Sequence, residues 1–152
     1  MNTSEVLQIA REIAGQQDLL KHFYVHTANH DDYFKEGIKK GIYIPQNAVL
    51  VAINDSPTQL GFGVRPGSYI EFMTDFDLKI AKDVSIQTRD ALKGKGYARK
   101  LINLMEQTSK QLRLNLIKVG NSHNPSFWKH MNYQRFVDSE DNGEIYLIKN
   151  FN

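Results

Sequence analysis

The sequence contains no cysteine and no long hydrophobic run. Without cysteine there is no disulfide, no thiolate metal site and no cysteine nucleophile, although this says little about the compartment in which the protein works. A membrane-spanning helix needs about 20 consecutive apolar residues, and no segment approaches that length. Residues 1–14 carry charged side chains at helical spacing and lack the apolar core of a signal peptide. We therefore expect a soluble, cytoplasmic protein without membrane partners.

The chain also carries little net charge. Its 19 basic residues are nearly balanced by 17 acidic residues, which gives a formal net charge of +2. Domains that bind nucleic acid usually concentrate positive charge, so this balance does not indicate such a partner. A length of 152 residues suits one domain with its own core. We predict a single domain over residues 1–152, with a helical N-terminal part over 1–45 and a strand-rich part over 47–148.

A glycine-rich basic segment over residues 93–96 runs directly into an amphipathic helical pattern. Gly94 and Gly96 can adopt backbone angles that other residues avoid, and they place no side chain between the backbone and a ligand. From Tyr97 on, apolar residues recur at helical spacing, while polar residues such as Glu106 fall on other faces. The first turn of a helix has unpaired N–H groups and the positive end of the helix dipole, and both favour an anion. This junction is therefore a candidate phosphate site.

The alternative is a plain strand-to-helix turn with solvated lysines, because a lone Gly-x-Gly is a weak motif. Two nucleotide-binding motifs are excluded at this place. A P-loop requires Gly-Lys followed by Ser or Thr, whereas Lys95 is followed by Gly96. A dinucleotide-binding fingerprint requires three glycines in an early strand–helix–strand unit, and this segment has two. The phosphate site and the plain turn both stay open on the residues alone.

The residue patterns predict an α+β fold. The N-terminal part reads as helices: one capped by Ser4 and closed by Gly15, a second over residues 18–24, and a third that ends near Gly41. The rest contains short apolar or alternating segments bounded by turn residues. Predicted strands cover residues 48–53, 60–64, 69–73, 78–88, 114–119, 134–137 and 144–148, and predicted helices cover 97–111 and 125–131. The strand, helix and strand over 78–119 form a right-handed crossover, whose turn lies at the ligand-binding edge of the sheet.

Histidines and aspartates gather near the end of the N-terminal part: His22, His26, His30, Asp31 and Asp32. Imidazole and carboxylate groups are good ligands for divalent metals. His30, however, follows a loop-like segment, and a polar loop that lines a substrate cleft explains the same residues. We favour the loop and predict no metal.

Two motifs in this order of elements resemble those of the GNAT superfamily of acyl-CoA-dependent N-acyltransferases. The family's loop reads Gln/Arg-x-x-Gly-x-Gly/Ala, and here it reads Lys93-Gly94-Lys95-Gly96-Tyr97-Ala98, with lysine in the first place. A later helix in the family often ends in aromatic-Tyr/Trp-x-Lys-Leu-Gly-Phe, and here the chain reads Phe127-Trp128-Lys129-His130-Met131-Asn132-Tyr133. Asparagine suits the glycine place because it tolerates left-handed backbone angles. The resemblance covers roughly residues 47–148, and the helical N-terminal third is atypical because most members begin with a strand.

The resemblance implies a GNAT-like mixed, mostly antiparallel sheet of about six to seven strands, flanked by helices. Acetyl-CoA, as co-substrate, would lie in a V-shaped gap between the fourth and fifth strands. Its pyrophosphate would rest on the glycine loop, and its pantetheine arm would pair with the end of the fourth strand, where a backbone N–H would hold the thioester carbonyl. The implied donor-binding residues are Ile86, Gln87, Thr88, Lys93, Gly94, Lys95, Gly96, Tyr97, Ala98, Arg99, Asn124 and Trp128.

The resemblance also implies direct attack of an amine on the thioester, with no covalent enzyme intermediate. Asp83 and Glu71 are the carboxylates nearest the predicted gap and are our candidates for the general base, although each also fits an ordinary charge on a strand or turn. The tyrosine that commonly supplies the acid in this family corresponds to Trp128, whose indole N–H does no acid chemistry at neutral pH. The acid is then water, Ser126 or His130, or is absent.

We predict an N-acetyltransferase that moves an acetyl group from acetyl-CoA to a primary amine on a small molecule, peptide or protein. One rival is a degenerate module of the same fold that binds acyl-CoA, or nothing, without turnover. Lys93 and Trp128 keep this rival open, because both depart from the family's pattern. A second rival is nucleic-acid binding through the basic residues near the loop, but these charges fit the phosphates of CoA more economically. A homodimer is left open.

Overall fold

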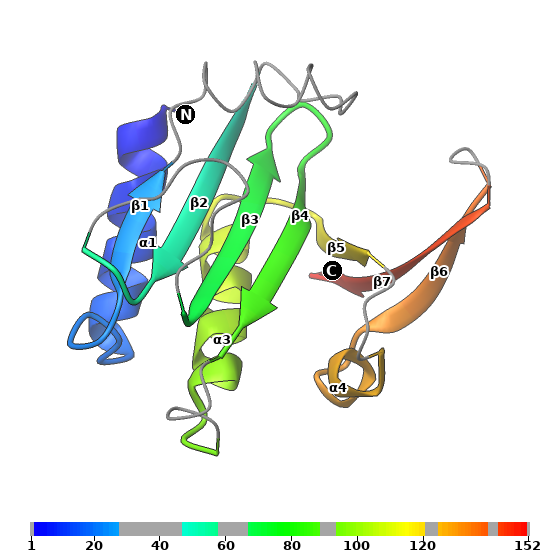
Figure 1. Ribbon diagram of the computed structural model, residues 1–152. Coiled ribbons are helices and arrows are strands. Elements are labelled where there is room, and N and C mark those ends of the chain that lie inside the picture. Colours follow the sequence, from blue (N-terminus) through cyan, green and yellow to red (C-terminus); the bar gives the residue numbers. More distant parts are fainter. Residues whose placement is uncertain are drawn as a thin grey trace.

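A computed structural model describes residues 2–27, 47–57, 67–88, 94–120, 125–139 and 143–151. These residues form, in order, α1 (Thr3–Gln16), β1 (Tyr24–Thr27), β2 (Ala48–Asn54), β3 (Tyr69–Asp75), β4 (Ile80–Gln87), α3 (Tyr97–Gln111), β5 (Leu116–Gly120), α4 (Pro125–His130), β6 (Gln134–Asp138) and β7 (Glu144–Asn150). The seven strands make one sheet in the order β1-β2-β3-β4-β5-β7-β6 (Figure 1). Among them, β4 and β5 are parallel and all other neighbours are antiparallel. The predicted α+β fold with a mostly antiparallel sheet of six to seven strands is confirmed.

Helices α1 and α3 contact each other and pack against one face of the sheet (Figure 1). Each helix turns an apolar stripe toward the strands, as its periodicity predicts. Strand β2 is buried along its whole length, and its alternate residues Val49, Val51 and Ile53 join the core that α1 and α3 cover. Helix α4 contacts β7 instead. In the part of the chain that the structure describes, no helix is long and apolar enough to cross a membrane.

The sheet divides between β4 and β5. Their parallel pairing covers two register positions, Ile80 with Leu116 and Ala81 with Ile117. Just beyond this point β4 carries one residue more than β3, so the register shifts, and Asp83 adopts a φ of 53°. Such a bulge bends a strand and increases its twist. The two strands diverge toward their carboxyl ends (Figure 1), as predicted for the fourth and fifth strands.

Strand β4 begins at Ile80, two residues later than the predicted fourth strand over residues 78–88. Leu78 lies in the preceding turn and is 62% exposed. A non-glycine residue at positive φ is uncommon, so the sequence gives little warning of the bulge at Asp83.

The prediction of a second short helix over residues 18–24 is wrong. After α1 the chain forms turns, with Asp18 at a φ of 59°, and then enters β1, which pairs antiparallel with β2. Leu19 and Phe23 are buried, as their spacing of four residues suggested, but they reach the core from a turn. The N-terminal third therefore contributes a strand as well as a helix. The predicted helix that ends near Gly41 and the predicted strand over 60–64 lie outside the described residues.

Helix α1 begins slightly earlier than predicted. Its N-cap is Asn2 rather than Ser4, since the Asn2 side chain accepts a hydrogen bond from the Glu5 N–H while the Glu5 carboxylate accepts one from the Asn2 N–H. This capping box satisfies donors at the helix N-terminus within the chain itself.

Candidate functional site

The site begins at the N-terminus of α3. Gly94 and Gly96 both have a φ of 79°, which favours glycine, and among the described residues a Cβ at either position would meet no atom within 4 Å. The first backbone hydrogen bond of the helix runs from the Lys100 N–H to the Gly96 carbonyl at 3.1 Å. The N–H groups of the three residues between them therefore lie ahead of the helical ladder and are available to an anion.

The N-termini of α1 and α3 differ in whether a side chain accepts hydrogen bonds from their first backbone N–H groups. Helix α1 is closed by the capping box of Asn2 and Glu5. Helix α3 has the N-cap Gly96, which offers no side chain, and no acidic residue lies in its first turn. Of these two helices, α3 is the one whose N-terminal donors still need an acceptor.

A cleft with a volume of about 330 Å³ opens in front of this N-terminus. Thr88, directly after β4, lines one side and Phe127 of α4 lines another. The Thr88 hydroxyl is buried and makes no hydrogen bond within the described part of the chain. A buried polar group without a partner is costly, so this hydroxyl marks where a ligand's polar group is needed. The cleft is lined by Thr88, Gly94, Gly96, Tyr97, Ala98, Arg99 and Phe127.

Tyr97 is held in place at the cleft by residues from the N-terminal third. His22 packs edge-on against its ring with 5.4 Å between centroids, and Phe23 packs against it at 5.5 Å. The Lys100 ammonium lies 5.6 Å from the same ring. Together with the exposed side chains of Lys95 and Arg99, Lys100 keeps the surroundings of the cleft positive.

Half of the twelve predicted donor-binding residues line this cleft. These six are Thr88, Gly94, Gly96, Tyr97, Ala98 and Arg99. Ile86 and Gln87 are the last residues of β4, directly before Thr88. Trp128 is 3% exposed and packs against Tyr133, while its neighbour Phe127 faces the cleft. Lys93 and Asn124 lie outside the described residues. The role of each residue in binding CoA stays a prediction.

The edge of β4 that faces β5 is open beyond the bulge. From Asp83 to Gln87 this edge has no β5 partner in the described register, because pairing ends at Ala81 with Ile117. Backbone groups need partners, and an extended ligand arm can supply them by adding to a strand edge. This open edge leads directly to Thr88 and the cleft.

Asp83 lies on the bulge, next to the point where the strands separate. The residue as a whole is exposed, yet the protein around its carboxyl partly desolvates it and raises its pKa. The ammonium groups of Lys82 and Lys118 oppose the effect of burial and lower this pKa, whereas the Asp75 carboxylate raises it. Together these effects raise the pKa of Asp83, and a carboxylate with a higher pKa accepts a proton more readily.

Glu71 lies on β3, on the other side of the bulge, and is buried. Its register neighbours are Ala52 and Ser85. Side chains alternate along a strand, and the flanking Ile70 and Phe72 belong to the core under α1 and α3, so Glu71 points to the opposite face. The two predicted carboxylates therefore lie on neighbouring strands, Asp83 on the bulge and Glu71 beside it.

The histidines do not form a metal site where the structure describes them. His22 packs on Tyr97, and the His26 Nε2 lies 3.0 Å from the Ser56 carbonyl oxygen. Among the described residues no group of three histidine, cysteine or acidic side chains is placed to hold a metal ion. His30, Asp31 and Asp32 lie outside those residues.

The sequence did not predict two features of the structure, one in the cleft and one in α3. Phe127 opens the second motif, but nothing in the motif indicated that it, rather than Trp128, faces the cleft. Glu106 was expected on a polar face of its helix and is instead 6% exposed, with an ion pair to Lys149. A charged residue beside an apolar stripe is a weak signal, and its partners come from distant segments.

No protein-family model matches the sequence, and no curated protein matches it. Solved structures do match. An acetyltransferase of the GNAT family from Staphylococcus aureus Mu50 is 12% identical with a TM-score of 0.52, over 99% of this chain and 93% of that one. A Klebsiella pneumoniae protein assigned as an acyl-CoA N-acyltransferase is 13% identical with a TM-score of 0.51, over 86% and 98%.

A third match is the N-acetylglutamate synthase of Neisseria gonorrhoeae, solved with coenzyme A and N-acetylglutamate. It is 8% identical with a TM-score of 0.50, and the match covers 98% of this chain and 32% of that one. The chain therefore has the fold of the GNAT acyltransferases. At such low identity the likeness concerns the fold, and function must be argued from the site.

Proposed function

We propose that the protein is an acyl-CoA-dependent N-acyltransferase that transfers an acetyl group from acetyl-CoA to a primary amine. The observation that carries the proposal is the cleft at the end of β4, where the open N-terminus of α3 meets the Thr88 hydroxyl, which is buried without a partner among the described residues. A ligand with an anionic group and an amide-bearing arm satisfies both. The gonococcal synthase of the same fold, solved with coenzyme A, supports this choice of donor.

The donor is held by backbone more than by side chains. Its pyrophosphate accepts hydrogen bonds from the N–H groups of residues 97–99 and is surrounded by the positive side chains of Lys95 and Arg99. Its pantetheine arm extends along the open edge of β4, with an amide bonded to the Thr88 hydroxyl. Phe127 closes the cleft with an apolar ring.

The transfer needs no covalent enzyme intermediate. The amine nitrogen attacks the thioester carbonyl carbon, and a backbone N–H of β4 near Ile86 holds the developing oxyanion. Asp83 or Glu71 accepts the proton that the ammonium acceptor loses. The carbon–sulfur bond then breaks, and the thiolate takes its proton from water, Ser126 or His130, since the buried Trp128 indole cannot supply one. The products are an N-acetylated amine and free CoA.

The tryptophan at position 128, where the family commonly has its tyrosine acid, and Lys93 keep one rival open, a module that binds acyl-CoA without turnover. The acceptor on which an active enzyme works is a primary amine on a small molecule, peptide or protein. A cytoplasmic location remains a prediction from the sequence.

Release of CoA from acetyl-CoA tests the proposal directly. The chain has no cysteine, so a thiol-reactive dye reports the CoA thiol without a protein background. Thiol release that depends on an added amine, across a panel of polyamines, amino acids and peptides, would support the transferase. Binding of acetyl-CoA without release for any amine would favour the binding module. No binding would contradict the transferase and would leave only a degenerate module that binds no acyl-CoA.

A further inference from the structure

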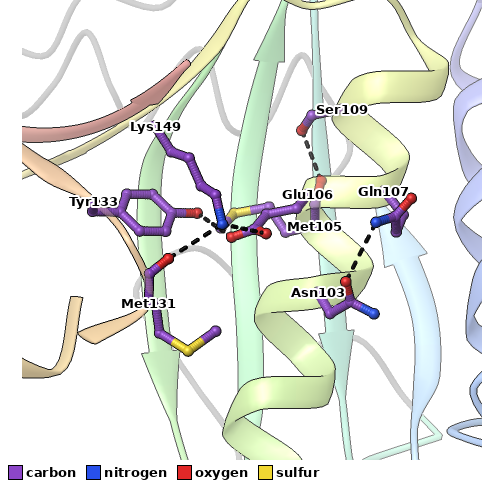
Figure 2. Close-up of polar contacts among 8 residues, drawn as sticks. All are labelled: Asn103, Met105, Glu106, Gln107, Ser109, Met131, Tyr133 and Lys149. Carbon is purple, nitrogen blue, oxygen red and sulfur yellow. Dashed lines mark hydrogen bonds and ion pairs between the residues drawn. The ribbon is translucent and has the colours of Figure 1, made fainter. Parts of the chain in front are cut away.

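A buried polar network joins α3 to the far part of the sheet (Figure 2). The Tyr133 hydroxyl donates to Glu106 Oε2 at 2.8 Å, and the Lys149 ammonium donates to Glu106 Oε1 at 3.0 Å. Lys149 also donates to the Met131 carbonyl at 3.2 Å. Glu106 and Tyr133 are 6% and 2% exposed. We call Glu106, Tyr133 and Lys149 the Glu106 clamp.

The Glu106 clamp spans the division of the sheet. Glu106 belongs to α3, which packs mainly on β3 and β4 and also contacts β5. Tyr133 lies between α4 and β6, and Lys149 belongs to β7, on the β5 side of the division. Backbone pairing between β4 and β5 covers only two register positions. The side-chain network is therefore a further link across the division, in addition to the strand pairing and the contact of α3 with β5.

The clamp is connected to the cleft through aromatic rings. The Tyr133 ring packs edge-on against Trp128 with 4.9 Å between centroids, and Trp128 packs edge-on against Phe127 at 5.9 Å. Phe127 lines one side of the cleft, and the first turn of α3 lines the other. Glu106 is on the same helix as that first turn. Both walls of the cleft are thus tied to the same buried carboxylate.

We propose that Glu106, Tyr133 and Lys149 are positioning residues that fix the distance between α3 and α4, and so the width of the acyl-donor cleft. The proposal rests on the proposed function, because it assigns the cleft to the acyl donor. It adds a role for three residues that touch neither the donor nor the acceptor.

The Glu106 carboxylate needs both of its hydrogen-bond donors in place, so the positions of Tyr133 and Lys149 relative to α3 are tightly constrained. A buried carboxylate has lost its hydration and must keep its hydrogen-bond donors. Burial first, and then the charge of Glu106 and the hydrogen bond to it, raise the pKa of Tyr133 above its ordinary value, so the phenol keeps its proton and stays a donor. The ammonium of Lys149 neutralises the carboxylate and lies 5.5 Å from the Tyr133 ring.

The test compares two deletions of a buried hydroxyl. Tyr133→Phe removes the bond to Glu106 while keeping the ring on Trp128. Ser109→Ala is the matched control, because the Ser109 hydroxyl is buried on the same helix but donates only within it, to the Met105 carbonyl at 2.8 Å (Figure 2). We expect both variants to lose some thermal stability. We expect only Tyr133→Phe to bind CoA more weakly, by about tenfold, with kcat changed less than KM. Glu106→Gln leaves one acceptor oxygen where the carboxylate has two and places an amide NH2 against a donor, so it should weaken CoA binding in the same direction as Tyr133→Phe.

If the wild type binds CoA and Tyr133→Phe binds it as tightly as Ser109→Ala does, the proposal is wrong. If the wild type does not bind CoA, the proposed function fails, and a ligand-free measurement decides the clamp. Trp128 is the single tryptophan, so its fluorescence and its quenching by acrylamide report α4 alone. Unchanged Trp128 quenching in Tyr133→Phe would overturn the clamp. Should Tyr133→Phe fail to fold, Lys149→Met removes the other donor and is expected to change both readouts in the same direction.

Discussion

Ala81 of β4 and Ile117 of β5 are the last paired residues of two parallel strands, and beyond them the sheet is open. The bulge at Asp83 follows within two residues and turns β4 away from β5. The open strand edge then leads to Thr88 and to the uncapped N-terminus of α3. One break in the sheet thus creates both the space for an extended donor and the backbone groups that bind it.

Thr88→Val should separate binding from stability. The Thr88 hydroxyl is buried without a partner in the described part of the chain, so its removal should leave the free energy of unfolding unchanged or raise it by up to about 1 kcal/mol. If the hydroxyl bonds an amide of the donor, acetyl-CoA binding should weaken by roughly three- to tenfold. Thermal unfolding and calorimetric titration measure the two effects.

Thr108→Val is the matched control for that change. The Thr108 hydroxyl is likewise buried without a partner among the described residues, but it lies in α3 away from the residues that line the cleft. It should show the same effect on stability and none on CoA binding. Equal losses of binding in both variants would refute the role of Thr88.

Asp83→Asn and Glu71→Gln should identify the general base. Loss of a general base typically lowers kcat by about 10²- to 10⁴-fold, while the Kd for acetyl-CoA should stay close to the wild-type value. Steady-state kinetics with a responsive amine measure kcat for each variant. Only the variant that lacks the base should show the large fall; if neither does, water or another residue accepts the proton.

The raised pKa of Asp83 gives a separate prediction for stability. A carboxyl whose pKa is raised by folding binds its proton more tightly in the folded state, so its stabilising contribution is complete below the unfolded value of 3.8 and is lost as pH rises through the folded value. Asp83→Asn removes this dependence. The stability of the variant relative to the wild type should therefore increase as pH rises from 3 toward neutral, as measured by urea unfolding at several pH values. A difference that is flat with pH would show that burial does not perturb this carboxyl.

Asn2→Ala should destabilise the protein without affecting the donor. The variant loses the capping box of α1 and should unfold about 1 kcal/mol more easily. Helix α1 packs on α3 through the core, so a weakened Kd for CoA in this variant would mean that global stability, rather than the local site, controls binding. Chemical unfolding and calorimetry on the same preparation decide this.

The sequence predicted the parts of the fold that local rules determine. Helix α3 was predicted with the bounds that the structure has. Its beginning is marked in the sequence by Gly96, which the structure shows at a left-handed angle, and by the apolar stripe that starts at Tyr97. The strand β2 and the last hairpin were found from apolar runs and turn residues in the same way.

The errors arose where distant contacts or unusual backbone angles decide the structure. Leu19 and Phe23 fit a helix as well as a turn, and only the left-handed Asp18 and the pairing of β1 with β2 exclude the helix. Glu106 is buried because its partners come from 27 and 43 residues away, which no local pattern reveals. Tertiary contacts of this kind override local propensity.

The central claim is that the N-terminus of α3 binds the pyrophosphate of an acyl-CoA. Gly96 has a φ of 79° and open space around its missing side chain, and asparagine and aspartate are the residues that tolerate such an angle best after glycine. Gly96→Asn and Gly96→Asp should therefore both fold, and they differ essentially by one negative charge. Calorimetric titration with acetyl-CoA should show binding to the wild type, a moderate loss for Gly96→Asn, and a further loss of more than about tenfold for Gly96→Asp. Equal affinity of folded Gly96→Asp and Gly96→Asn for acetyl-CoA would contradict a phosphate site at this helix.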